Sequence, residues 1–320
     1  MLTGVLYRTG GRVRPSVRGG HNNGDSLHSQ EAFRNGLHAK MESVMEQSPT
    51  SPMNGIISTP QWLDNTDLKL LREDHYLVRP WLDQWRAKVT YWTIWDFHEF
   101  YNREFCRPIF AAGPIPVDQY YYNVEESLQI IIQLLQHQFL SERAIREFLI
   151  TLSNICERNI PKTNTILVYS PPSAGKNYFF DLVMDFYWNR GQIQNPNKHN
   201  QFAYQEAVGK RILLWNEPNY HSEEEDQLKM LLGGDACTVR VKCKQDMAIN
   251  KTPVIILTNK KLPLQREKAF ADRVKQYEWR SAPFLKDKTK KPTPLCYVPL
   301  LLAYGIAPEC KHVEGQIPFM

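Results

Sequence analysis

Residues 165–180 read Thr-Ile-Leu-Val-Tyr-Ser-Pro-Pro-Ser-Ala-Gly-Lys-Asn-Tyr-Phe-Phe. The apolar run from Ile166 to Tyr169 predicts a buried strand, and residues 178–188 predict a helix. A strand, a tight loop with Gly175-Lys176 and a helix are the layout of a phosphate-binding loop. Backbone N–H groups at the start of such a helix point at one spot, where the helix dipole favours an anion. The stretch therefore predicts a P-loop in which Lys176 neutralises the β- and γ-phosphates.

The loop departs from the usual G-x-x-x-x-G-K-[ST] pattern at two positions. Ser170 replaces the first glycine, which is compatible with the loop if its backbone avoids a positive φ. Asn177 replaces the hydroxyl residue that binds Mg²⁺, and its amide oxygen is also a hard ligand. The expected nucleotide-binding residues are Ser170, Pro171, Pro172, Ser173, Ala174, Gly175, Lys176 and Asn177. On this loop alone, an ordinary strand–turn–helix with an exposed lysine remains the alternative.

Composition and charge limit the possible classes of protein. Of 320 residues, 42% are hydrophobic and 12% aromatic, enough for a sizeable core in one large or two small domains. The formal net charge of +5 permits a nucleic-acid partner without requiring one. The longest apolar candidate, residues 295–306, is too short for a membrane span and is interrupted by Pro299. We therefore expect no membrane partner.

The chain divides by composition into four parts. Residues 1–55 are rich in Gly, Ser, Asn and Arg, including Arg8, Arg12, Arg14 and Arg18, which predicts a disordered basic tail. Residues 56–160 predict a mainly helical module rich in aromatic residues. Those aromatic side chains would suit stacking on bases, but core packing is the favoured interpretation. Residues 161–282 hold the P-loop core, and residues 283–320 predict a C-terminal helical segment and tail.

Two helices are expected at the end of the aromatic module. Asn123 and Glu126 form a capping-box pattern and precede apolar residues at helical spacing. Ser141 can cap the second helix, which Pro161 prevents from continuing.

A second apolar strand ends in an acid. Residues 211–217 read Arg-Ile-Leu-Leu-Trp-Asn-Glu, so the carboxylate of Glu217 is expected at the carboxyl edge of the sheet, beside the phosphates. There Glu217 would hold Mg²⁺ through water or orient the attacking water. By itself, an acid after an apolar strand is a common pattern without functional meaning.

A basic segment follows Gly233-Gly234. Residues 238–244 alternate like a strand, which would place Arg240, Lys242 and Lys244 on one face. Three cations on one strand face are unfavourable without an anionic partner. The segment therefore predicts a contact with an anionic ligand.

Two more segments complete the series. Residues 252–259 predict a buried strand that ends in Thr258-Asn259, and residues 270–279 place Arg273 between apolar anchors. In this order, the motifs resemble the superfamily 3 helicase domain of parvovirus large non-structural proteins. The P-loop and the segment Leu-Trp-Asn-Glu-Pro-Asn are most similar to those of the insect-infecting densovirus branch. The resemblance covers residues 120–305.

The resemblance implies a role for each matching residue of the nucleotide site. Lys176 would bind the β- and γ-phosphates, and Asn177 would lie where Mg²⁺ is usually held. Glu217 would serve Mg²⁺ and activate water, and Asn259 would sense the γ-phosphate. Arg273 would be the arginine finger, which acts on the nucleotide of a neighbouring subunit.

The resemblance also implies fold, cofactors and partners. The fold would be an α/β P-loop domain of the AAA+ kind with a mostly parallel sheet, preceded by a small helical module that serves oligomerisation. The cofactors would be ATP and Mg²⁺, and the partners single-stranded DNA and other copies of the chain, usually in a hexameric ring. Lys242 and Lys244 would grip the DNA, with Arg240 beside them. The expected activity is ATP-driven helicase or translocase action in viral genome replication, in the host cell nucleus.

Three departures from the family pattern keep alternatives open. Asn216 precedes Glu217 where two adjacent acids are often found, and Asn177 replaces a hydroxyl residue. The chain has no His-x-His motif of the nicking nuclease that begins full-length members, so we expect the helicase part alone. A degenerate relative that binds DNA or protein without hydrolysing ATP is one alternative. A P-loop kinase-like transferase is another, although it leaves the basic hairpin and Arg273 unexplained.

Overall fold

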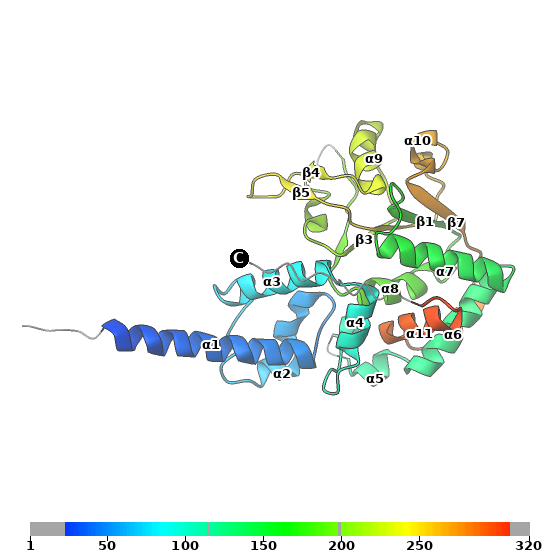
Figure 1. Cartoon of the computed structure of the whole chain (residues 1–320). Coiled ribbons are helices and arrows are strands. Elements are labelled where there is room, and N and C mark those ends of the chain that lie inside the picture. Colours follow the sequence, from blue (N-terminus) through cyan, green and yellow to red (C-terminus); the bar gives the residue numbers. More distant parts are fainter. Residues whose placement is uncertain (1–22, 114, 198–199, 308–320) are drawn as a thin grey trace, which may run out of the picture.

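A five-stranded sheet lies at the centre of the molecule (Figure 1). The structure is a computed structural model and describes residues 23–113, 115–197 and 200–307. The strand order is β2-β3-β6-β1-β7, and all neighbouring strands are parallel. The strands are β1 (Thr165–Tyr169), β2 (Arg190–Gln192), β3 (Ile212–Asn216), β6 (Val254–Thr258) and β7 (Val274–Glu278). The predicted α/β class and the three apolar strands of the predicted site are confirmed.

The central strands are apolar along their length because both faces of the sheet are covered. Ile166 and Val168 of β1 pack into one apolar core, whereas Leu167 between them packs into a second core on the other face. This alternation follows the two-residue period of a strand. Continuous apolar strands of this kind are typical of parallel sheets.

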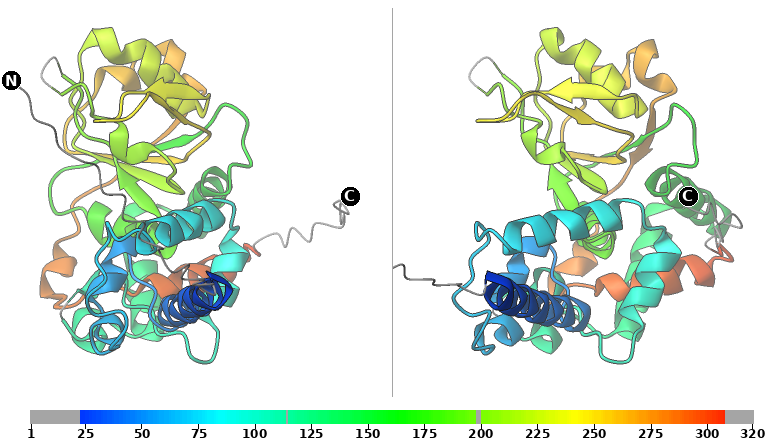
Figure 2. Two further views of the ribbon diagram at one scale, coloured as in Figure 1. Left: turned by 90° about the vertical axis from the view of Figure 1, so that its left-hand side faces the viewer. Right: turned by 60° about the vertical axis from the view of Figure 1, so that its left-hand side comes forward.

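Helices of different length cover the two faces (Figures 1 and 2). The first face carries α6 (Val124–Gln138), α7 (Glu142–Cys156), α8 (Lys176–Phe186) and α11 (Tyr297–Ala303). The second face carries α9 (Glu225–Gly233), α10 (Lys268–Ala271) and the hairpin of β4 (Cys237–Val239) and β5 (Met247–Ile249). The expected capping box of α6 is present, since the Asn123 side chain accepts from Glu126 N at 2.8 Å. The Ser141 side chain caps α7 as predicted.

The region before α6 is helical and shares the first core. It consists of α1 (Asn23–Gln47), α2 (Pro60–Leu63), α3 (Val78–Thr90), α4 (Ile94–Tyr101) and α5 (Val117–Tyr120). Trp62, Trp81 and Phe97 are buried, and Trp85 contacts Trp188, which follows α8. The interpretation of these aromatic residues as core residues is therefore confirmed. The short 3₁₀ helices are η1 (Met53–Ser58), η2 (Phe110–Ala112), η3 (Gln205–Ala207), η4 (Ser222–Glu224), η5 (Pro263–Gln265), η6 (Pro283–Asp287) and η7 (Pro294–Cys296).

The prediction of disorder up to residue 55 is wrong for residues 23–55. Helix α1 buries Leu37, Met41, Val44 and Met45, whose spacing places them on one helix face. The carboxylate of Glu42 also accepts hydrogen bonds from the indole N–H groups of two tryptophans of α3. Tertiary packing thus stabilises a helix whose own sequence is mostly polar. The arginines at positions 8, 12, 14 and 18 lie outside the described residues.

Among the residues that the structure describes, no helix has the length and apolarity needed to cross a membrane.

Candidate nucleotide site at the carboxyl edge of the sheet

The loop between β1 and α8 has the backbone that a phosphate-binding loop requires. Ser170 is buried, donates its N–H to Thr258 O at 3.1 Å and is absent from the residues with positive φ, so it meets the condition set for replacing glycine. The left-handed positions are Ser173, with φ of 60°, and Gly175, with φ of 82°. A Cβ at Gly175 would also lie 2.7 Å from a methyl group of Leu285. Gly175 is therefore required both by its conformation and by close packing.

Helix α6 supports this loop from behind. The side chain of Gln138 donates to Ala174 O at 3.0 Å and to Arg280 O at 2.8 Å. Ala282 N donates to Ser173 O at 2.9 Å. The loop is thus bonded to the end of α6 and to the segment after β7. Gln138 could not be predicted as a supporting residue, because one glutamine at a helix end has no periodic or motif context.

Three of the predicted catalytic side chains meet at the carboxyl edge. Lys176 Nζ, in the first turn of α8, donates to Asn259 Oδ1 at 2.8 Å and lies 3.8 Å from Glu217 Oε1. Asn259 N donates to Glu217 Oε2 at 3.0 Å. Glu217 and Asn259 directly follow β3 and β6, which are neighbours in the sheet, and β1 is the next strand. Parallel pairing therefore brings together residues that are far apart in the sequence.

Burial defines the electrostatics of Lys176. Its side chain is only 6% exposed, so the alternative of an exposed lysine on an ordinary turn is wrong. Burial lowers the pKa of the Lys176 ammonium, and the nearby Glu217 carboxylate opposes this shift. A buried ammonium with one carboxylate at 3.8 Å still favours additional negative charge. A phosphate group would supply that charge.

The oxygen and nitrogen groups of this edge fit ATP and Mg²⁺. The first backbone N–H groups of α8 have no acceptors within their own helix and would face an anion bound at the helix N-terminus. Asn177 is exposed beside them, and the half-exposed Glu217 carboxylate offers a second hard oxygen ligand. Among the described residues, no three His, Cys, Asp or Glu side chains form a metal-binding group. Mg²⁺ is usually held by one or two side chains together with the phosphates of the substrate, and Asn177 and Glu217 fit such an arrangement.

Arg273 does not join these residues within the chain. It directly precedes β7, at the amino edge of the sheet, whereas Lys176, Glu217 and Asn259 lie at the carboxyl edge. Its guanidinium donates to Lys229 O at 3.0 Å through Nε and to Ala269 O through a terminal nitrogen. A Cβ at Gly233 would lie 3.1 Å from Arg273 Nε. Arg273 is therefore held on the surface between α9 and α10.

The basic hairpin exists, but its cations do not share a strand face. Strand β4 ends at Val239, and Lys244 N donates to Val241 O at 3.2 Å in the turn that follows. Cys243 has a left-handed φ of 58°, which interrupts the alternation. The predicted strand face of Arg240, Lys242 and Lys244 is therefore wrong. Lys242 and Lys244 are instead exposed near the hairpin tip.

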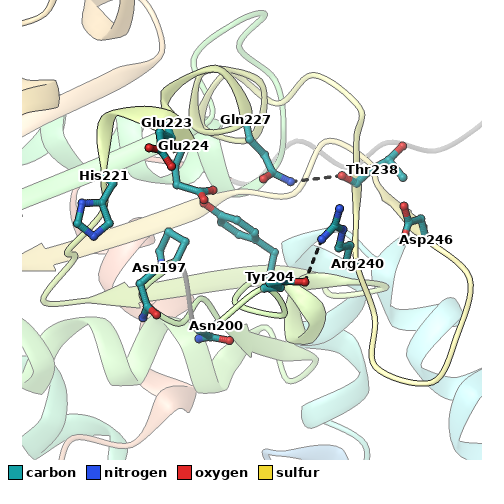
Figure 3. A pocket seen from close by; sticks show the side chains of 12 residues that line it. Asn197, Asn200, Tyr204, His221, Glu223, Glu224, Gln227, Thr238, Arg240 and Asp246 are labelled. Atoms are coloured by element: carbon teal, nitrogen blue, oxygen red, sulfur yellow. Dashed lines mark hydrogen bonds between the residues drawn. The ribbon is translucent and has the colours of Figure 1, made fainter.

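Arg240 lines a polar cleft of about 550 Å³ beside the hairpin (Figure 3). It donates to the side-chain oxygen of Gln201 at 3.0 Å. Three acids, Glu223, Glu224 and Asp246, also line this cleft. The cleft has mixed charge, so the basic surface of the hairpin consists mainly of the two tip lysines.

Comparison with known proteins identifies the family. A family model described as parvovirus non-structural protein NS1 matches residues 115–280, just over half of the chain. The Initiator protein NS1 of Junonia coenia densovirus is 40% identical over 296 residues, which are 90% of this chain and 54% of that protein. The Initiator protein NS1 of Diatraea saccharalis densovirus is 38% identical over 275 residues, 84% of this chain and 50% of that protein. The chain thus spans about half of the length of these relatives.

A solved structure of JCV helicase overlaps with a TM-score of 0.49 at 13% identity, covering 77% of this chain and 75% of that one. The family assignment does not depend on this overlap. The resemblance inferred from the order of the motifs is confirmed by the family model and by the densovirus proteins. The chain belongs to the parvovirus non-structural protein NS1 family.

Proposed function

We propose that the chain is an ATP-dependent DNA helicase or translocase that acts on single-stranded DNA in parvovirus-type genome replication. The observation that carries the proposal is the convergence of Lys176, Glu217 and Asn259 behind a left-handed P-loop turn. The proposed site of action is the host cell nucleus, and the proposed assembly is a homo-oligomeric ring, with a hexamer as the expected size.

Phosphoryl transfer needs positioning and neutralisation of charge more than covalent chemistry. In the proposed mechanism, Lys176 and the N–H groups of α8 hold the β- and γ-phosphates. The carboxylate of Glu217 orients the attacking water, and Asn177 and Glu217 are the side chains that would hold Mg²⁺. When bound, Mg²⁺ supplies neutralisation of the phosphate charge.

Asn259 connects the two charged groups. Its side-chain oxygen accepts from Lys176, and its backbone N–H donates to Glu217. A γ-phosphate that draws the Lys176 ammonium away would free the Asn259 side chain, which is the chemical basis for a sensing role. In the ring, Arg273 of one subunit would stabilise charge at the nucleotide of its neighbour. Arg240, Lys242 and Lys244 would contact DNA phosphates.

Measurement of ATP hydrolysis with and without single-stranded DNA tests the proposal. We expect hydrolysis by the wild-type chain, with stimulation by DNA. Glu217→Gln should keep nucleotide affinity within about twofold and lose most turnover, roughly a hundredfold or more, since an amide cannot polarise water as a carboxylate does. Nucleotide binding without hydrolysis by the wild-type chain would instead support a binding protein without ATPase activity.

A further inference from the structure

Glu217 has a backbone conformation that its own sequence disfavours. Its φ is 46°, in the left-handed region that side-chain-bearing residues rarely adopt. Pro218 follows it, and a following proline further restricts the backbone to extended conformations. A residue remains in such a conformation only where surrounding contacts over-determine it. The contacts around Glu217 therefore show what holds its carboxylate in place.

Two of these contacts come from the adjacent strand and its end. Glu217 N donates to Leu257 O at 2.8 Å, which extends the pairing of β3 with β6 by one residue. The Glu217 carboxylate accepts from Asn259 N at 3.0 Å. These bonds hold the backbone N–H and the carboxylate of Glu217. Its backbone carbonyl and the turn that follows must be held by other groups.

The side chain of Asn195 holds that turn. Its Nδ2 donates to Glu217 O at 3.3 Å, and its Oδ1 accepts from Trp215 Nε1 and from Asn219 N, both at 2.9 Å. One amide thus bonds residues on both sides of Glu217 as well as Glu217 itself. Trp215 is fully buried, so the anchor at this end of the turn is rigid.

Asn195 is itself fixed in position. Ile193 N donates to Leu214 O at 2.8 Å, which continues the pairing of β2 with β3 toward Asn195. Pro196 is buried and restricts the backbone of Asn195. Gln194 N also donates to Ala203 O at 3.0 Å, so backbone hydrogen bonds hold the segment that carries the amide of Asn195, although this segment lies beyond the end of β2.

We infer that Asn195 is a positioning residue for Glu217: it holds the left-handed turn that aims the carboxylate at the phosphate end of the site. The inference rests on the proposed function for the role of Glu217. The side-chain hydrogen bonds of Asn195 go to Trp215, Glu217 and Asn219 and not to Lys176 or the P-loop, so it would act on turnover and not on nucleotide affinity.

Two variants distinguish the hydrogen bond that Asn195 donates to Glu217 O from the other bonds of its side chain. Asn195→Asp keeps an oxygen acceptor for Trp215 and Asn219, but its second oxygen repels the Glu217 carbonyl in place of donating to it. Asn195→Ala removes all three bonds. A matched control is Asn102→Ala, because the Asn102 side chain is exposed and, among the described residues, His98 is its one side-chain hydrogen-bond partner.

We expect kcat for ATP to fall roughly ten- to a hundredfold in Asn195→Asp and Asn195→Ala, as small displacements of catalytic groups do. The affinity for ATP and the KM should stay within about twofold of wild type, and Asn102→Ala should match wild type in both. In a Glu217→Gln background, Asn195→Asp should cause no further loss. Wild-type kcat in a folded Asn195→Asp variant, or a further loss in that background, would overturn the inference.

The outcome is distinguishable from failure of the proposed function. Full turnover in Glu217→Gln refutes the role of Glu217, whereas loss in Glu217→Gln with wild-type kcat in Asn195→Asp refutes only the positioning. A crystal structure of Asn195→Asp gives a result that does not depend on activity. We expect Glu217 to leave the left-handed region and its carboxylate to leave Asn259 N. An unchanged Glu217 would contradict the inference.

Discussion

The two edges of the parallel sheet differ in what their polar side chains bond to. At the carboxyl edge, Lys176, Glu217 and Asn259 bond to one another through side-chain and backbone groups. At the amino edge, Arg273 bonds only to backbone carbonyls and has no acid within ion-pair distance among the described residues. The ammonium at the carboxyl edge thus has a carboxylate beside it, as does Arg211 at the amino edge, which pairs with Glu157 at 2.7 Å, whereas Arg273 has no charged partner among the described residues. In the proposed ring, Arg273 of one copy would complete the nucleotide site at the carboxyl edge of its neighbour.

Loss of the carboxyl-edge cation should have the largest effect. Lys176→Ala removes the buried ammonium that neutralises phosphate charge, so ATP hydrolysis should fall at least about a thousandfold. The fold should remain, because Glu217 is half-exposed and can be solvated without its partner. Steady-state ATPase and thermal melting measure the two effects. The control is Lys69→Ala, an exposed lysine whose side chain has no hydrogen bond or ion pair to any residue that the structure describes. Hydrolysis at the wild-type rate in Lys176→Ala would exclude the P-loop assignment.

Arg273, at the amino edge, should be needed for ATP hydrolysis at the site of a neighbouring copy. Arg273→Ala should leave ATP binding within about twofold and lower hydrolysis about a hundredfold or more. Mixing Arg273→Ala with Glu217→Gln should restore part of the activity, since each variant can complete the site that the other lacks. Arg273→Lys keeps the charge but loses the planar fork and should remain impaired. ATPase of mixtures across a range of ratios measures the rescue, and no rescue at any ratio would argue against a site shared between the two edges.

The hairpin lies at neither edge of the sheet, so changes in it should affect DNA binding more than ATP hydrolysis. Lys242→Ala combined with Lys244→Ala should weaken binding similarly for every oligonucleotide sequence. The slope of log affinity against log salt should fall by at least about one unit, at about 0.7 per phosphate contact. Basal ATPase should survive, while its stimulation by DNA should vanish.

A charge-matched control separates a local contact from a change in net charge. Lys69→Ala combined with Lys286→Ala removes two exposed lysines elsewhere and should leave the slope unchanged. An unaltered salt slope in the folded hairpin variant would show that the tip lysines are merely solvated.

The carboxyl edge could be predicted because buried strands have a strong sequence signal. Apolar runs that end in Glu217 and Asn259 specify both the strand and the edge at which the polar residue lies. Parallel pairing then brings these residues to Lys176. The burial of Lys176 could not be predicted, because it depends on tertiary contacts, among them those of its ammonium with Asn259 and Glu217.

The remaining differences have a common physical origin. In the hairpin, the alternation in the sequence continues past Val239, where the strand itself ends. Cys243 adopts a left-handed conformation, which cannot be predicted because the position holds neither glycine nor asparagine. Gln138 supports the P-loop and Asn195 supports the turn at Glu217. Neither role could be predicted, because the partners of a single polar side chain depend on tertiary contacts. Helix α1 could not be predicted, because four apolar residues in a polar sequence are a weak signal and the helix is stabilised by tertiary contacts, among them those of Glu42 with the tryptophans of α3.

The shared apolar core has a consequence for the evolution of the chain. The boundary predicted near residue 160 separates two sequence characters, but one core contains Trp85 before it and Trp188 after it. A different aromatic module in this place would have to match the shape of Trp188, since mismatched rings leave gaps in the shared core. We therefore expect the module and the P-loop half to be inherited as one unit, with compensating changes in ring size across their contact.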